Sequence, residues 1–148
     1  MEYLTETAVS AKEEGKGLIL QGDLNAWLGP KVIPGDKRDQ HENGNMFEEF
    51  LITNDLTVVN SLSICKGVNT RIAIRKQKSI KSVLDFFVVC QRVLQSVVRM
   101  EIDDDRKYIA TNFNKVKKGG KATDSDHLTT TLTVNFNVVP QKPNKVEI

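Results

Sequence analysis

Three polar clusters beside apolar, strand-like runs most constrain how this chain can fold. They follow the run 17–21, interrupt the run 82–89 and precede the last apolar run, and their members are Asp23 with Asn25, Asp85, and Asp126 with His127. A carboxylate beside buried apolar side chains costs free energy unless another group pairs with it. We therefore expect the fold to bring the clusters together, and titratable groups gathered in this way are typical of an active site.

The length and ordinary composition fit one domain, which we expect at 1–139, with a tail or linker containing two prolines at 140–148. No apolar run approaches the roughly 20 residues of a membrane-spanning helix, and the N-terminus lacks the basic start and apolar stretch of a signal peptide. Cys65 and Cys90 lack the spacing of a metal site, and reduced thiols are typical of an intracellular protein. We expect a nuclear or cytoplasmic protein without a membrane partner.

The apolar patterning predicts several strands and a few helices. Helices are expected at 3–14 and 45–53, the second capped by Asn43 or Asn45, and 24–40 is expected to be loop. Strands are expected at 17–21, 56–60, 69–75, 82–90, 96–102 and 128–138. The basic link 76–81 should join 69–75 to 82–90 in a hairpin-like arrangement. This pattern is typical of an α+β fold with layers around a sheet core.

Asp23 and Asn25 come at the end of the first expected strand. Residues two apart in an extended segment point the same way, so both side chains should project together. A carboxylate can take a proton or hold a metal-bound water, while a carboxamide can donate to a phosphate oxygen. The alternative is an ordinary turn, since Gly, Asp and Asn are common turn residues.

Asp85 has large apolar neighbours on both sides, so its carboxylate needs a donor. The chain has two histidines, and His41 lies in a charged, loop-like stretch, so His127 is the expected partner. Such a pair fixes the imidazole tautomer and stabilises its charged form. The alternative is that Asp85 bonds backbone amides or lies at a frayed strand end. Asp126 is placed to be a ligand of a hard cation such as Mg²⁺.

Basic residues gather in two stretches that contain no acidic residue, 56–84 and 106–123, although the net charge is only +2. The two stretches could form an electrostatic track for a polyanion backbone. The alternative is a set of solvated loops kept basic for solubility. Possible nucleic-acid contacts in the first stretch are Arg71, Arg75, Lys76, Lys78 and Lys81.

The ordered set of motifs resembles the endonuclease/exonuclease/phosphatase superfamily. The matching segments are GDLNA at 22–26, SVLDF at 82–86 and SDH at 125–127. Within that superfamily the chain most resembles the apurinic-type endonuclease domains of LINE-type retrotransposons, on the further segments 43–50, 55–61 and 70–71. The resemblance covers residues 5–137.

The resemblance implies a two-layer α/β sandwich with the DNase I-like fold, built from a mainly antiparallel or mixed sheet with flanking helices. It also implies hydrolysis of DNA phosphodiester bonds with Mg²⁺ or Mn²⁺. The implied roles are water activation by Asp23, phosphate binding by Asn25, metal binding by Asp126, phosphate contact and charge stabilisation by His127 oriented by Asp85, and phosphate or supporting contacts by Thr70 and Ser82.

The family's first half, which supplies an Asn and a Glu that hold metal, has no counterpart in the 22 residues before Asp23. The chain therefore resembles a C-terminal portion, and half a sandwich should expose an apolar face prone to self-association. Whether the portion is an enzyme stays open between three alternatives: an endonuclease fragment that is weak or inactive alone, another phosphoesterase of the superfamily, and a relic that binds nucleic acid or a protein. A missing N-terminal half or the reverse transcriptase domain of a parent polyprotein is a further expected partner.

Overall fold

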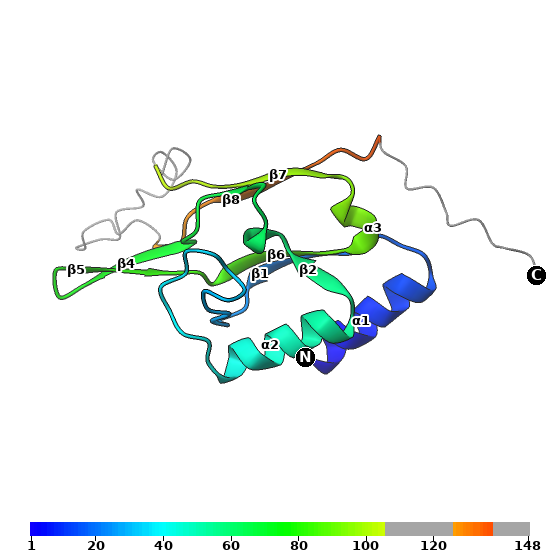
Figure 1. Cartoon of the computed structure of the whole chain (residues 1–148), viewed down its shortest axis with the longest axis horizontal. Coiled ribbons are helices and arrows are strands. Elements are labelled where there is room, and N and C mark those ends of the chain that lie inside the picture. The colour runs from blue at the N-terminus through cyan, green and yellow to red at the C-terminus, as the bar shows by residue number, and fades with distance from the viewer. Residues whose placement is uncertain (106–125, 138–148) are drawn as a thin grey trace, which may run out of the picture.

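The computed structural model describes residues 1–105 and 126–137 and confirms the α+β class (Figure 1). The helices are α1 (Glu2–Glu13), α2 (Glu42–Thr53) and the short α3 (Gln91–Leu94), and a 3₁₀ turn spans Val59–Ser61. The strands are β1 (Ile19–Asp23), β2 (Leu56–Val58), β3 (Cys65–Lys66), β4 (Arg71–Arg75), β5 (Lys78–Ser82), β6 (Asp85–Cys90), β7 (Val97–Ile102) and β8 (Thr130–Val134). Within the described residues, no helix has both the length and the apolar character needed to cross a membrane.

The described strands form two three-stranded sheets and a separate hairpin. The first sheet has the order β1-β6-β2, and both outer strands are antiparallel to β6. The second has the order β3-β7-β8, with β3 parallel and β8 antiparallel to β7. The two sheets lie in layers, and α2 lies on the side of the first sheet that faces away from the second (Figure 1). This arrangement matches the predicted mixed-sheet architecture with flanking helices.

Strand β6 separates two hydrophobic cores, because successive side chains of a strand point to opposite faces. Phe86 and Val88 belong to the core that includes the apolar side chains of α2, whereas Phe87 and Val89 belong to the core that includes those of β7. Phe86 packs against Phe47 of α2 with ring centroids 5.4 Å apart. Burial on both faces explains why β6 reads as a continuous apolar run rather than an alternating one.

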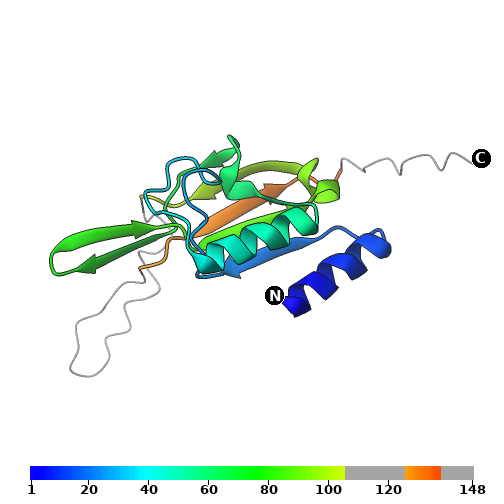
Figure 2. The same cartoon turned by 60° about the horizontal axis from the view of Figure 1, so that its bottom comes forward.

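The predicted hairpin between 69–75 and 82–90 is wrong, because the link 76–81 itself forms most of a strand. Strand β4 pairs with β5, and the register ends with Arg75 opposite Lys78. The two residues between them, Lys76 and Gln77, have φ of 46° and 62°. Two central residues with positive φ make the tight turn whose twist matches a two-stranded ribbon. The β4–β5 hairpin projects away from the two sheets (Figure 2).

Helix α2 begins earlier than predicted, and its cap is His41 rather than Asn43 or Asn45. The His41 Nδ1 accepts a hydrogen bond from the Gly44 backbone N–H at 3.2 Å. The imidazole also stacks on Trp27 with ring centroids 4.5 Å apart. A Cβ at position 44 would lie 1.8 Å from the Trp27 carbonyl oxygen, so this turn of the helix requires glycine. The loop that follows β1 is therefore fixed to the start of α2.

The last predicted strand, 128–138, is shorter in the structure. Strand β8 ends at Val134, and Phe136, which lies within the predicted range, is 69% exposed. The run 56–60 likewise leaves the strand after Val58 and continues as the 3₁₀ turn. The basic stretch beyond 105 and the predicted tail 140–148 lie outside the described residues.

Both cysteines are free and half-buried. Burial, with a smaller contribution from the nearby Asp104 carboxylate, raises the pKa of the Cys65 thiol to about 11. The protonated thiol donates to the Gly67 carbonyl oxygen at 3.6 Å. Cys65 is therefore a protonated side chain at neutral pH rather than a reactive thiolate.

Candidate active site

The three polar clusters meet at one end of the first sheet. The antiparallel register of β1 and β6 places Asp23 directly opposite Asp85. The third cluster reaches them through β4, because Arg71 and His127 form an isolated antiparallel bridge. The Ile72 N–H donates to the Asp126 carbonyl oxygen at 2.7 Å and strengthens that link. Segments far apart in the sequence thus deliver two carboxylates and an imidazole to one place.

His127 contacts both carboxylates with different ring nitrogens. Its Nδ1 lies 2.9 Å from Asp85 Oδ2, which is the predicted pair, and its Nε2 lies 3.8 Å from Asp23 Oδ2. Because an ionised carboxylate only accepts hydrogen bonds, the short contact requires a proton on Nδ1. One ligand atom from each of the three residues lies within 4.8 Å of the others, which is close enough for a shared cation.

Asp126 is held by an arginine that the sequence assigns to nucleic-acid contact. Arg71 places Nε at 2.7 Å and a terminal nitrogen at 2.6 Å from the same oxygen, Asp126 Oδ2. The hydrogen bond from this guanidinium is the main cause that lowers the pKa of Asp126 below its ordinary value. The other oxygen, Oδ1, lies 3.9 Å from His127 Nε2 and so faces the cluster of Asp23, Asp85 and His127.

Asn25 does not project from an extended strand with Asp23, so that part of the prediction is wrong. Strand β1 ends at Asp23, and Asn25 has a φ of 44°, in the left-handed region. The Asn25 backbone N–H donates to Asp23 Oδ1 at 2.9 Å, which is the bond of an Asx turn. The backbone of this segment therefore forms the turn that was the alternative prediction. Both residues are exposed at the site.

Thr70 and Ser82 are buried beside the site rather than exposed in it. Thr70 is fully buried, and its Oγ1 accepts hydrogen bonds from the backbone N–H groups of Leu84 at 2.9 Å and Asp85 at 3.0 Å. The Thr70 N–H donates to the Ser82 carbonyl oxygen at 3.0 Å. Their positions fit supporting contacts better than direct contacts to a phosphate.

Asn60 is a site residue that the sequence does not reveal as one. Its side-chain amide donates to the Asp85 carbonyl oxygen and accepts from the Phe87 N–H, both at 3.1 Å. The residue is 6% exposed. An amide at the end of the apolar run 56–60 is costly to bury unless it is hydrogen-bonded, and that cost is the signal that could have identified it.

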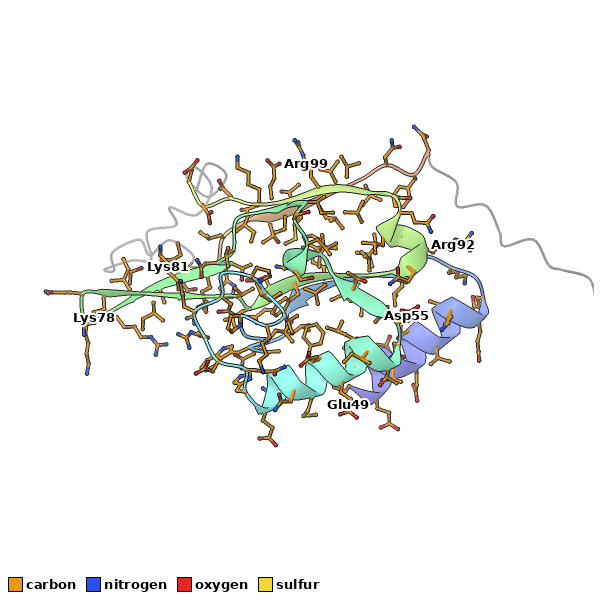
Figure 3. The ribbon with its side chains drawn as sticks, in the orientation of Figure 1. Glu49, Asp55, Lys78, Lys81, Arg92 and Arg99 are labelled. Carbon is orange, nitrogen blue, oxygen red and sulfur yellow. The ribbon has the colours of Figure 1, made fainter. Side chains whose placement is uncertain are left out.

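The remaining basic candidates lie along the β4–β5 hairpin. Arg75, Lys76, Lys78 and Lys81 are all exposed. Lys78 points outward at the far end of the hairpin, and Lys81 lies nearer the sheets (Figure 3). Arg71, at the start of β4, pairs with His127, so the basic side chains of the hairpin begin next to the site.

The described helices and strands define an α+β domain, and a known endonuclease domain has a similar fold. Among solved structures, the chain is similar to the endonuclease domain of TRAS1, a telomere-specific non-LTR retrotransposon, with a TM-score of 0.60 and 21% sequence identity. The match covers 95% of this chain and 52% of that chain, so this chain spans about half the length of that domain. No family model and no curated protein matches the sequence. The predicted resemblance is therefore confirmed at the level of the fold.

Proposed function

We propose that this chain carries part of the active site of a metal-dependent phosphodiesterase that cleaves DNA. The observation that carries the proposal is the contact of His127 with Asp85 at 2.9 Å, next to Asp23 at 3.8 Å. An imidazole oriented by one carboxylate and facing a second provides proton transfer and charge stabilisation together. The fold of a retrotransposon endonuclease domain supports the choice of a nucleic-acid substrate.

The side chains divide the work according to their positions. Asp23 orients or deprotonates the attacking water, and Asn25, next to it in the exposed turn, binds the scissile phosphate. His127, with Nδ1 held by Asp85, presents Nε2 to the phosphate and, once Nε2 has accepted a proton, stabilises the developing negative charge. Asp126 places its Oδ1 near the same nitrogen, 3.9 Å from His127 Nε2.

A divalent cation, Mg²⁺ or Mn²⁺, fits the donors in this site. Asp23, Asp85 and His127 offer ligand atoms within 4.8 Å of one another, and Asp126 Oδ1 lies beside them. When bound, such an ion neutralises phosphate charge and lowers the pKa of a bound water. Magnesium keeps several waters and needs few protein carboxylates, which suits a cluster of this size.

The DNA backbone would lie along the exposed β4–β5 hairpin. Its basic side chains adjoin the site through β4, and phosphate contacts from lysine and arginine supply most non-specific affinity for DNA. Arg71 contributes to Asp126 rather than to this surface. Such a protein would act inside the cell, beside the rest of the endonuclease fold and a reverse transcriptase.

Plasmid nicking in the presence of Mg²⁺ tests the proposal. Because the chain carries only part of the site, we expect weak wild-type cleavage. It should be lost in Asp126→Ala and fall by about 10² to 10⁴ in His127→Ala, the usual range for a proton-transfer group. Arg99→Ala is the matched control, because Arg99 lies on the outside of β7, away from the site (Figure 3). Equal cleavage by wild type and both site variants would refute catalysis by these residues.

The second candidate is a domain that binds nucleic acid without cleaving it. The observation in its favour is that the chain spans about half the length of the endonuclease domain it resembles. This function predicts retention of a DNA duplex in a gel-shift assay together with no nicking by the wild type. Hydrolysis of a small phosphodiester or sugar phosphate with no action on DNA would instead indicate another phosphoesterase.

A further inference from the structure

The backbone at the start of β6 is hydrogen-bonded by two buried side chains, one on each side of Asp85. Thr70 Oγ1 accepts from the Leu84 and Asp85 N–H groups, and the Asn60 amide bonds the Asp85 carbonyl and the Phe87 N–H. Thr70 is 0% exposed and Asn60 is 6% exposed. The bonds from the Leu84 and Phe87 N–H groups are buried, so these two donors depend on protein partners.

Thr70 also bonds the segment that carries His127. Its carbonyl oxygen accepts from the Leu128 N–H at 2.7 Å, and the next residue, Arg71, bridges His127. One buried threonine is therefore bonded to the backbone beside both members of the Asp85–His127 pair. Asn60 reaches only the Asp85 side, from the 3₁₀ turn that follows β2.

We propose that Thr70 and Asn60 are positioning residues that fix the Asp85 carboxylate against His127 Nδ1 and thereby set the imidazole tautomer. The catalytic role of this positioning rests on the proposed function. The hydrogen bonds that produce it involve protein atoms only. The first residue of a strand frays unless its backbone groups are bonded, and these two side chains bond both the N–H and the carbonyl of Asp85. With the carboxylate fixed at 2.9 Å, a proton stays on Nδ1, and Nε2 is the nitrogen that faces Asp23, 3.8 Å away.

The imidazole nitrogens can be observed directly by long-range ¹H–¹⁵N NMR, at a pH where His127 is neutral. The chain has only two histidines, and the variant His41→Asn assigns the second set of signals. We expect His127 to be the Nδ1-protonated tautomer in the wild type and in Thr70→Ser, which keeps the hydroxyl. Thr70→Val keeps the shape without the acceptor, and Asn60→Leu removes the amide, so both should lose the dominance of that tautomer. Asp85→Asn is the reference for loss of the carboxylate.

A folded Thr70→Val or Asn60→Leu protein with the wild-type tautomer would overturn the proposal. Because removing a buried hydrogen-bond partner can also unfold a domain, the wild type supplies a second readout. Amide hydrogen exchange at Leu84, Asp85 and Phe87 should be as slow as at Val88 in the centre of β6. Exchange at these amides as fast as at Gln77, in the exposed turn between β4 and β5, would overturn the proposal equally. Neither measurement uses DNA or metal, so a negative nicking result leaves both interpretable.

Discussion

The ion pair between Arg71 and Asp126 is a single-residue feature with a pH signature. Arg71 lowers the pKa of Asp126 in the folded state, so the pair stabilises the fold fully above the ordinary aspartate pKa of about 3.9. This contribution is lost as the pH falls through the lowered value. The Asp126 side chain is 39% exposed, so the pair is expected to contribute about 0.2 to 1 kcal/mol at pH 7.

Urea unfolding of Arg71→Gln and the wild type between pH 7 and pH 2.5 measures this contribution. The difference in unfolding free energy should shrink below about pH 4. Arg75→Gln removes the same charge from the exposed end of the same strand and should show no such trend. A difference between wild type and Arg71→Gln that stays constant over the whole range would mean that the pair is not the cause.

The β4–β5 hairpin is the element that carries the proposed DNA contacts. Neutralising one phosphate contact should reduce the slope of log binding constant against log salt concentration by about 1. We therefore expect Arg75→Gln and Lys78→Gln each to weaken binding of a DNA duplex and to reduce this slope. The measurement is a salt titration of fluorescence anisotropy without divalent metal.

The matched control for the hairpin variants is Arg99→Gln on β7. Arg99 is exposed and lies in another sheet, with Glu101 3.4 Å away. Its slope should equal that of the wild type. Equal slopes for the hairpin variants and for Arg99→Gln would place the DNA on some other surface.

The whole molecule depends on β6, because both cores pack on this strand. Phe86 is 1% exposed, and truncation to alanine should cost about 3 to 5 kcal/mol of unfolding free energy. A domain of this size has about 5 to 15 kcal/mol in total, so urea unfolding of Phe86→Ala should show a greatly lowered midpoint. Ile74→Ala is the control, since Ile74 is 78% exposed on the hairpin and its loss should change stability by less than about 0.5 kcal/mol. Equal midpoints for the two variants would show that the core described here is not the stabilising one.

The α+β class, most of the helices and strands and the pairing of Asp85 with His127 can be predicted from local patterns in the sequence. Apolar periodicity and turn residues are local signals, and a carboxylate inside an apolar run can be matched to the few donors the chain has. The pairing of β4 with β5 was missed because the run 78–82 is basic and reads as a link, while its partner and the turn at Lys76 and Gln77 set its conformation.

The residues that surround Asp85 and His127 become apparent only when the chain is folded. Asn60, Thr70 and Arg71 are separated from Asp85 or Asp126 by 15 to 55 positions in the chain, and their contacts arise from strand register and sheet layering. Local patterns cannot encode such contacts, because a hydrogen bond between distant segments depends on how the whole chain packs. The sequence therefore predicted the side chains of the candidate site, and the packing of β4, β6 and the 3₁₀ turn determined how they are held.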